Sequence, residues 1–558
     1  MTNGAISDHF SLLSKLMDIH GEDAFRAKNY SIAAYNIDKL PRQASEMDEA
    51  ELFATRGIGN STGSKIRELL ETGKLQALED IMSRTPQGIL DMMQIKGLGP
   101  KKIAVIWKEM GIESVGELEY ACHENRLSSF KGFGAKTQQS IIDNIQFIRA
   151  NQNFRLWAEV EGISNTLVTQ LGKANPGKLF SLTGEIRRQM PTIEHIDLLT
   201  DTDEKTLQQQ FGMTPGVNMK IADDTLLVDA PNQPAIRVHL TTKDKFYNKL
   251  FITTGADEFL TAFKGKYTLP ESPASEEEIF TTNKLPYIAP ALRETAAVLD
   301  KAAANKLPEL IQATDIKGII HSHSTWSDGA DTIEAMAKAC IEQGYEYLVI
   351  SDHSQAAFYA NGLDPKRIAE QHREVDTLNE KLAPFRIFKS IEVDILNDGS
   401  LDYTDDVLAT LDLVIASVHT NLKMTEEKAM DRVLKAIRNP YTNILGHPTG
   451  RLLLSREGYP LDHKVIIDEC VKHNVVIEIN AHPRRLDLDW KWIEYAIEAG
   501  AILSIDPDAH AIAGYHDVYY GTLAAQKGGL TKERNLSSYS LKEFEEWLSK
   551  KTIKTSVN

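Results

Sequence analysis

The 558-residue sequence predicts a multidomain protein of the α and α/β classes. Three observations support this prediction. Up to about residue 150 the pattern is one of short helices joined by glycine-containing turns, and beyond it helices mix with strands. From about residue 315 strands and helices alternate regularly. We therefore expect three regions, which cover residues 1–150, 151–312 and 313–558.

The composition is that of an ordinary folded protein. Hydrophobic residues make up 42% and charged residues 25%, which excludes wholesale disorder. The formal net charge is −17, so any contact with DNA must come from local groups rather than from an overall positive field. The three cysteines are too few and too widely spaced for a disulfide framework or a zinc knuckle. Because neither a signal peptide nor a long apolar run is recognisable, we expect a cytoplasmic protein without a membrane partner.

Three glycine-rich turns recur in the N-terminal region. Each turn has two glycines separated by one residue and is followed by a helix. In two of the turns, a lysine comes two residues after the second glycine. The helix N-terminus behind such a turn offers unpaired N–H groups to a phosphate, which is how helix-hairpin-helix turns hold a nucleic-acid backbone. The simpler alternative is that each glycine pair only starts a helix. The candidate DNA-binding residues are Gly57, Gly59, Gly97, Gly99, Lys101, Gly132, Gly134 and Lys136.

The middle region has a mixed pattern. Strands are expected at residues 225–228 and 235–240. Residues 268–278 are polar and rich in proline, glutamate and serine, which predicts a linker or an exposed loop.

Seven apolar runs in the C-terminal region are separated by helical patterns, for example at 333–343 and 464–473. Repeated strand–helix units of this length predict a parallel sheet, closed as a (βα)7 barrel. In such barrels, functional residues gather where the strands end. The expected strands are 318–320, 347–350, 385–388, 413–416, 442–445, 475–479 and 501–505.

Histidines and acids are concentrated at the ends of six of these strands. Imidazole and carboxylate groups without thiolates suit Zn²⁺, Mn²⁺ or Fe²⁺. Nine candidate ligands are too many for one ion and fit two or three, with Glu392 and Asp508 as natural bridges. Such ions lower the pKa of bound water and neutralise charge on a phosphoryl group. The candidate ligands are His321, His323, Asp328, His353, Glu392, His419, His447, Asp508 and His510.

Two arginines also follow strands of the expected barrel. The guanidinium of Arg451 or Arg485 could clamp a phosphate through paired hydrogen bonds. Other C-terminal histidines lack such placement, and we expect ordinary core or surface roles for them. These histidines are His372, His463, His473 and His516.

The nine candidate ligands resemble the motifs of the PHP (polymerase and histidinol phosphatase) family, over about residues 315–550. That resemblance implies a distorted (βα)7 barrel with a trinuclear site, often loaded with Mn²⁺ or Zn²⁺, that cuts phosphoesters. The whole chain also resembles the bacterial family X DNA polymerases that carry a PHP domain at the C-terminus. In that family a helix-hairpin-helix domain precedes an α+β nucleotidyltransferase palm and a thumb.

The palm motifs of that family are altered in this sequence. Glu185 replaces the serine of the Gly-Ser-x-Arg-Arg motif, and His195 replaces the first aspartate of the Asp-x-Asp pair. Arg237 stands where a third aspartate is expected, and residues 254–259 differ from the family's thumb motif. A polymerase holds two Mg²⁺ ions with three carboxylates, which Asp197 alone cannot do. We therefore expect a palm that is folded but catalytically weak or inactive.

Lys65 matches the family lysine that forms a Schiff base with an abasic sugar, six residues after Gly59. A lyase needs such a lysine, with a lowered pKa, close to a phosphate site. The alternative is a solvated lysine on a helix.

Four functions follow from these patterns. The favoured one is a metal-dependent phosphoesterase in DNA repair, in which the hairpins hold DNA while the barrel removes 3′ nucleotides or blocked 3′ ends, or incises beside abasic sites. The alternatives are an active family X polymerase with an associated exonuclease, a small-molecule phosphatase, and a non-catalytic scaffold that binds DNA ends. The expected cofactors are two or three divalent ions, the expected partner is DNA, and a monomer is favoured.

Overall fold

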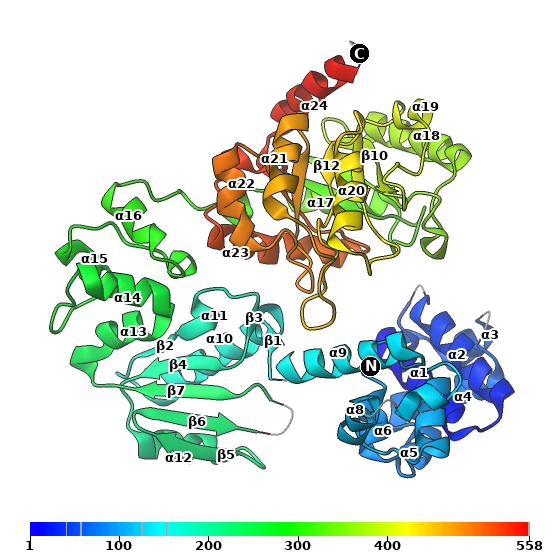
Figure 1. The fold of residues 1–558 in the computed structure, drawn as a ribbon, viewed down its shortest axis with the longest axis horizontal. Coiled ribbons are helices and arrows are strands. Elements are labelled where there is room, and N and C mark those ends of the chain that lie inside the picture. The colour runs from blue at the N-terminus through cyan, green and yellow to red at the C-terminus, as the bar shows by residue number, and fades with distance from the viewer. Residues whose placement is uncertain (41, 56–57, 124–125, 152, 231–232, 556–558) are drawn as a thin grey trace. The chain divides into compact units, whose positions relative to one another are not determined.

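The structure is a computed structural model of the chain, and it describes all residues except 41, 56–57, 124–125, 152, 231–232 and 556–558. The chain divides into two units, Met1–Asn153 and Phe154–Asn558 (Figure 1). The second unit contains both the mixed middle region and the C-terminal barrel. Among the described residues, no helix is both long and apolar enough to cross a membrane.

The N-terminal unit is helical throughout its described secondary structure (Figure 1). Helix α1 packs along α2, and buried side chains such as Phe10 and Ile37 belong to one apolar core shared by the short helices. The helices are α1 (Asn3–His20), α2 (Ala24–Asp38), α3 (Glu49–Ala54), α4 (Asn60–Thr72), α5 (Gln76–Met82), α6 (Gln87–Met92), α7 (Pro100–Ala104), α8 (Val115–His123) and α9 (Ala135–Asn151).

The middle region forms a five-stranded sheet in the order β2-β4-β7-β6-β5, in which only β4 and β7 are parallel. The strands expected at 225–228 and 235–240 are confirmed as β6 and β7. The sheet strands are β2 (Phe180–Leu182), β4 (Ile196–Thr200), β5 (Asn218–Ala222), β6 (Thr225–Asp229) and β7 (Ile236–Leu240). Beside them lie α10 (Trp157–Ala174), α11 (Gly184–Arg187), α12 (Glu204–Phe211) and a separate pair, β1 (Arg155–Leu156) with β3 (Thr192–Ile193).

A helical subdomain follows the sheet and has its own aromatic core. Its helices are α13 (Phe246–Thr254), α14 (Asp257–Lys266), α15 (Glu276–Thr282) and α16 (Ala297–Ala303). The buried rings of Phe251 and Phe263 lie 4.7 Å apart at its centre, and both belong to the cluster of buried apolar residues that these helices share.

The expectation of an exposed linker at 268–278 is wrong at its C-terminal end. No helix or strand runs through residues 268–275, but α15 begins at Glu276, whose side chain is buried. The carboxylate of Glu276 accepts two hydrogen bonds from Arg187 and two from Arg293, at 2.6–3.1 Å. The sequence pattern missed this because the arginines that neutralise Glu276 come from other segments.

The C-terminal region is a barrel of seven parallel strands in sequence order, as predicted. It is nearly closed, because Ser322 and Ala509 form a bridge and the Ala509 carbonyl accepts a hydrogen bond from the His323 N–H at 2.8 Å. The strands are β8 (Gly318–Ser322), β9 (Tyr347–Ile350), β10 (Arg386–Asp394), β11 (Leu413–Ser417), β12 (Ile444–Leu445), β13 (Val476–Asn480) and β14 (Leu503–Asp506).

Helices follow most of these strands, so that apolar strand residues on both faces of the sheet are buried. The helices are α17 (Ile333–Glu342), α18 (Pro365–Leu382), α19 (Asp405–Leu408), α20 (Glu426–Ile437), α21 (His463–His473), α22 (Ile493–Ala499), α23 (Val518–Lys527) and α24 (Leu541–Thr555). Helix α24 contributes Phe544, which stacks on Tyr347 inside the barrel's second core with 4.6 Å between ring centroids. The three cysteines, Cys122, Cys340 and Cys470, are buried free thiols.

The buried ion pair at Glu276 makes a prediction about stability. Burial alone would raise the pKa of Glu276, but Arg187 and Arg293 outweigh it and lower the pKa to about 2. This pairing therefore stabilises the fold above the ordinary glutamate pKa, and its contribution is lost as the pH falls towards 2.

We expect Arg293→Met to lower the free energy of local unfolding by about 3 kcal/mol, because it removes one of the two guanidinium groups that neutralise a buried carboxylate. The measurement is hydrogen exchange of the amides of α13 and α15. The control is Lys266→Met, which removes an exposed ion pair with Asp300 and should cost less than about 1 kcal/mol. Equal losses in the two variants would contradict the prediction.

Candidate metal centre

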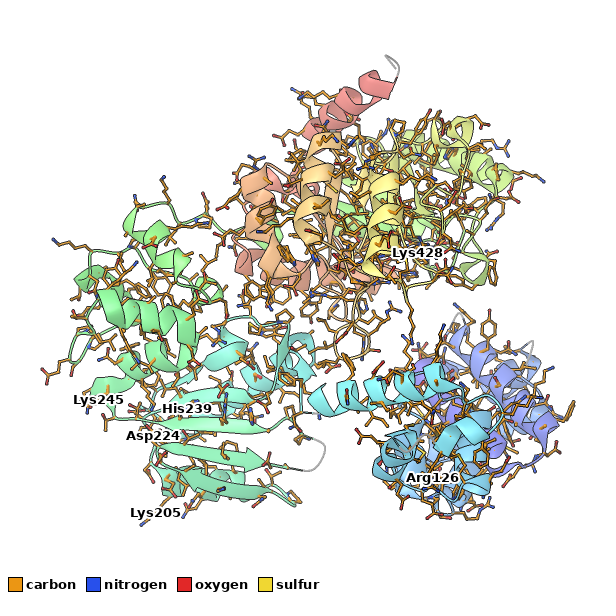
Figure 2. The ribbon with its side chains drawn as sticks, in the orientation of Figure 1. Arg126, Lys205, Asp224, His239, Lys245 and Lys428 are labelled. Carbon is orange, nitrogen blue, oxygen red and sulfur yellow. The ribbon has the colours of Figure 1, made fainter. Side chains whose placement is uncertain are left out.

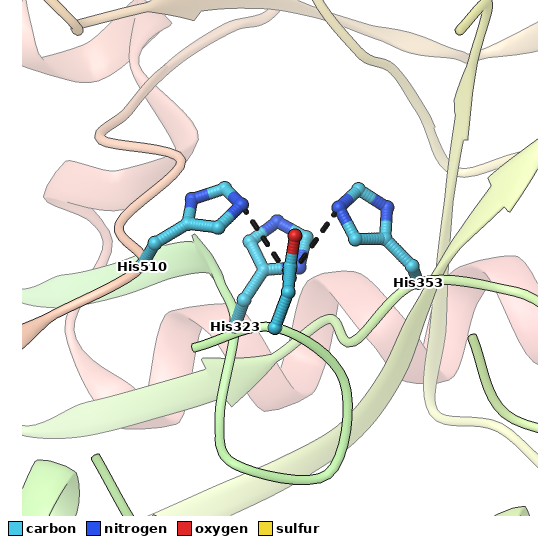
Figure 3. Close-up of side chains that lie close together, drawn as sticks. His323, His353 and His510 are labelled. Carbon is cyan, nitrogen blue, oxygen red and sulfur yellow. Dashed lines mark ion pairs between the residues drawn. The ribbon is translucent and has the colours of Figure 1, made fainter. Parts of the chain in front are cut away.

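All nine candidate ligands converge at the C-terminal rim of the barrel. Their ligand atoms form three groups, and within each group the atoms lie within 4.8 Å of one another. Figure 3 shows His323, His353 and His510 pointing towards a common position from three different segments. The groups are His323, Asp328, His353 and His510; His321, His323 and Asp508; and His353, Glu392 and His419. Because two histidines belong to two groups each, the three positions adjoin. His447 joins them through Glu392, from which its Nε2 is 2.9 Å away.

Two ligands lie within strands rather than after them, contrary to the sequence-based expectation. His321 is inside β8 and Glu392 is inside β10, which is longer than predicted. His323, His353 and His419 do follow their strands. The ligand set therefore lines the upper part of the barrel as well as its rim.

Glu392 occupies the middle of the constellation and is completely buried. Burial alone would raise its pKa, but the imidazoles of His419, His321 and His353 outweigh this and hold the pKa well below its usual range. Glu392 is therefore a carboxylate. The ring nitrogens that face it lie at 2.9 Å (His353 and His447), 3.0 Å (His419), 3.3 Å (His321) and 3.7 Å (His323).

The donor atoms of this centre fit divalent cations. Buried polar atoms are nearly always hydrogen-bonded, yet five atoms at the centre have no hydrogen-bond partner among the described residues. Burial and the neighbouring His353 ring also lower the pKa of His323 to about 3, which keeps this imidazole neutral, as a metal ligand must be. The five atoms are Nε2 of His321, Nδ1 of His323, His353 and His447, and Oε2 of Glu392.

Three of the ligands have an unfavourable backbone conformation. His321, His447 and Asp508 have φ angles of 60°, 22° and 51°, a region that non-glycine residues adopt only at an energetic cost. At His321 the register between β8 and β9 is also irregular. Strained backbone that the surrounding fold maintains is typical of functional sites.

Glu478 supports the centre, and sequence reasoning missed it. This buried residue lies on β13, where its Oε1 is 2.5 Å from Nδ1 of His321. Its Oε2 accepts a hydrogen bond from the backbone N–H of His447, also at 2.5 Å. Glu478 thus fixes one ligand's ring and another ligand's backbone, as residues behind metal ligands commonly do. A charged residue inside an otherwise apolar strand was the available signal.

Asp352 has a similar supporting role for the loop between His323 and Asp328. Its buried carboxylate accepts hydrogen bonds from the backbone N–H groups and the hydroxyls of Ser324 and Ser327, at 2.5–3.1 Å. Nε2 of Gln371 donates to it at 2.6 Å. This network holds the loop that carries Asp328 to its ligand group.

The two predicted phosphate-clamping arginines have different places. Arg485 lies at the centre, with Nε 3.7 Å from Oδ2 of Asp508. The guanidinium of Arg451 donates to the carbonyls of Arg485 and Leu486 and pairs with Asp489. Arg451 therefore holds the loop that carries Arg485, and its contact with phosphate stays a prediction.

Three sequence families match this chain. A helix-hairpin-helix domain matches residues 1–75, a SAM-like helix-hairpin-helix tandem matches residues 89–146, and the PHP domain matches residues 320–482. The DNA polymerase/3′-5′ exonuclease PolX of Bacillus subtilis (strain 168) is 34% identical over 557 residues, which is 96% of this chain and 97% of that relative. The chain belongs to the family X DNA polymerases with a C-terminal PHP domain.

The PHP domain also has shorter relatives. Probable phosphatases from a Thermoanaerobacter species and from Photobacterium profundum are each 29% identical, over 169 and 164 residues. Each match covers 29% of this chain and 62% of the phosphatase. The similarity is thus confined to less than a third of this family X chain.

The predicted helix-hairpin-helix turns have open, helix-starting geometry. Gly59 and Gly99 directly precede α4 and α7, and no side chain caps either helix. Gly97 and Gly132 adopt φ angles of 87° and 93°, which glycine tolerates best, and Gly134 precedes α9. Lys101 and Lys136 are exposed beside these turns, Lys65 lies partly exposed on α4, and Gly57 lies outside the described residues.

In the family X palm, the remaining carboxylate is neutralised. Asp197 on β4 is buried and accepts hydrogen bonds from Nε and Nη2 of Arg237 at 2.7 and 2.9 Å. Arg237 lies opposite it in the β4–β7 register. Nε2 of His239, which is labelled in Figure 2, is a further neighbour at 3.2 Å from Asp197. The structure thus places Arg237 directly beside Asp197, and its correspondence to the third aspartate of the family motif stays a prediction.

The glycine and the two arginines of the palm motif have structural roles. A Cβ atom at Gly184 would lie 2.4 Å from Oδ2 of Asp197, and its φ of 64° also favours glycine. Arg187 binds Glu276, while Arg188 donates to Glu294 at 2.7 Å and to the Thr254 carbonyl at 2.8 Å. Both guanidinium groups are therefore engaged within the protein.

We expect His323→Ala to reduce the divalent metal bound per chain, because His323 belongs to two of the three ligand groups. Elemental analysis of the purified full-length proteins measures this. The matched control is His463→Ala, which removes a histidine that stacks on Trp492 at 4.7 Å. Equal metal contents in wild type and His323→Ala would show that these residues are not the ligands.

Proposed function

We propose that this protein is a metal-dependent phosphoesterase that removes nucleotides from the 3′ end of DNA in repair, and that its palm has lost polymerase activity. The observation that carries the proposal is the convergence of nine imidazole and carboxylate groups, with the buried Glu392 carboxylate among them. Mn²⁺ or Zn²⁺ bound there would supply an acidified water and neutralise charge at phosphorus. The named relative, a DNA polymerase/3′-5′ exonuclease, supports the same reaction.

The residues of this chain have distinct tasks in the proposed reaction. The nine candidate ligands hold two or three cations, and Glu478 keeps the ring of His321 oriented. Arg485, next to Asp508, binds a non-bridging phosphate oxygen, which orients the scissile phosphodiester. The candidate ligands whose polar atoms lack a hydrogen-bond partner are buried in the barrel. A phosphate held at this centre would therefore be shielded from bulk water on the side that faces the barrel interior.

DNA is favoured as substrate over a small phosphomonoester. The open turns at Gly59, Gly99 and Gly134 offer helix N-termini to a phosphate backbone, and exposed lysines follow the turns at Gly99 and Gly134. The similarity to the probable phosphatases covers only 29% of the chain. It therefore gives no reason to connect the N-terminal region with a small-molecule phosphatase. The regions proposed are 1–150 for DNA binding, 151–312 for the palm and thumb, and 313–558 for phosphoesterase activity.

We expect Arg485→Ala to lower kcat/KM for Mn²⁺-dependent cleavage of a single-stranded oligonucleotide by about 10- to 100-fold, since a charged hydrogen bond contributes about 1.5–3 kcal/mol. Its metal content should stay at the wild-type level. Arg438→Ala, which removes an exposed arginine paired with Glu469, is the control. Asp508→Asn should abolish cleavage. If Asp508→Asn cuts as fast as wild type, the metal centre is not the active site.

The inactive palm is tested by primer extension. In an Asp508→Asn background, which prevents 3′ trimming from hiding synthesis, the protein should add no nucleotides to a primed template with Mg²⁺ or Mn²⁺. The reason is that Asp197 is already paired with Arg237 and His239 and cannot assemble a two-metal site. Extension that disappears on Asp197→Ala would contradict this assignment.

A further inference from the structure

Two adjacent aromatic side chains are exposed at the mouth of the barrel. Phe358 is 83% and Tyr359 is 59% exposed, which places them among the most exposed large apolar residues of the described chain. They lie on a short 3₁₀ turn, η7 (Phe358–Ala360), and their ring centroids are 5.9 Å apart. Exposing a phenylalanine this fully costs solvation free energy, which a ligand that covers the ring would recover.

The turn that carries the two rings is firmly anchored. Ala357 and Ala360 on either side of the rings are buried, and the Gly362 N–H donates to the Ala357 carbonyl at 3.1 Å. On one side, Nδ2 of Asn361 donates to the carbonyl of Trp326, in the loop that carries Asp328. The rings are therefore presented by a fixed backbone.

On the other side, the same segment is tied to the loop after β10. The Ala356 N–H donates to Oδ2 of Asp402 at 2.6 Å, and the Tyr403 hydroxyl donates to the Leu363 carbonyl. The Leu363 N–H returns to the carbonyl of the ligand His353 at 2.8 Å. The aromatic turn is thus held between ligand-bearing segments.

The aromatic turn also lies near the metal centre. It begins five residues after His353, and Tyr359 shares its surroundings with charged groups of the centre. Burial, followed by the carboxylates of Asp394, Glu392 and Asp328, raises the pKa of Tyr359 to about 12, while Arg485 acts in the opposite sense. The tyrosine is therefore a neutral phenol, and more than half of its surface is exposed.

We propose that Phe358 and Tyr359 form a stacking platform for the terminal nucleobases of a single-stranded DNA 3′ end whose phosphodiester lies at the metal centre. This inference rests on the proposed function. Every nucleobase has a π-face, so aromatic stacking binds single strands with little sequence preference. A phosphodiester has a base on the nucleotide to each side, so a substrate held by Arg485 and the cations brings a base to the barrel mouth. A small phosphomonoester would leave both rings uncovered.

The test compares two oligonucleotides that differ only in the presence of bases on the last two 3′ nucleotides. Wild type should cleave the base-bearing strand with the higher kcat/KM. Phe358→Ala should reduce that preference by roughly 5- to 150-fold, the range that corresponds to one lost base–aromatic stack. Phe358→Trp should retain the preference, and so should the control Val465→Ala, which alters an exposed apolar residue on α21. An unchanged preference in Phe358→Ala would overturn the platform.

A binding measurement separates the platform from the proposed function. A phosphorothioate oligonucleotide with a 3′-terminal 2-aminopurine should lose fluorescence on binding wild type and Phe358→Trp, and lose clearly less on binding Phe358→Ala. If wild type cleaves neither oligonucleotide, the proposed function fails, and the quenching still decides on the platform. Equal quenching by wild type and Phe358→Ala would refute the platform even if DNA cleavage is confirmed, and would leave an apolar protein partner as the occupant of the two rings.

Discussion

The structure of the barrel mouth depends on keeping the Glu392 carboxylate ionised while it is completely buried. A buried charge is costly unless it is paired, and five imidazoles face this one at 2.9–3.7 Å. To bring them there, six strands must contribute ligands to one point, which a barrel with parallel strands achieves. The strained φ angles at His321, His447 and Asp508 are consistent with that demand, because the ligand positions are imposed by the centre rather than by local preference.

Around this centre, buried acidic side chains rather than apolar contacts hold the loops in place. Asp352 accepts from the loop that carries Asp328, and Glu478 accepts from the backbone of His447. Asp487 accepts from the backbone N–H groups of Thr449 and Gly450, both at 2.9 Å. A hydrophobic contact has no direction, whereas a carboxylate that accepts two or more N–H groups fixes a loop's orientation. Loops that carry metal ligands need that precision.

Much of this arrangement could be predicted from the sequence. The seven apolar runs predicted the strands, because each is short, apolar and followed by a helical pattern. The nine candidate ligands were found because they stand at or near strand ends, and parallel strands bring those ends together. Glu478, Asp352 and Glu276 could not be assigned, because the role of each depends on partners far away in the chain. The same limit applies to Arg451, because a strand-end arginine has the same sequence signature whether it faces a phosphate or a backbone carbonyl.

Residues of the palm motif also hold the fold together. Within residues 154–558, the motif residue Arg188 connects the palm to the barrel. Its guanidinium pairs with Glu294, and its carbonyl accepts a hydrogen bond at 3.1 Å from the buried Lys527 of the barrel region. Lys527 also pairs with Glu294. Burial lowers the pKa of Lys527 to about 8, while Glu294 beside it acts in the opposite sense. A Cβ at Gly184 would collide with Asp197, and replacing Arg188 would remove the hydrogen bond to Glu294, the residue that also pairs with Lys527. Selection on folding alone would therefore be enough to retain the glycine and the arginines of this motif.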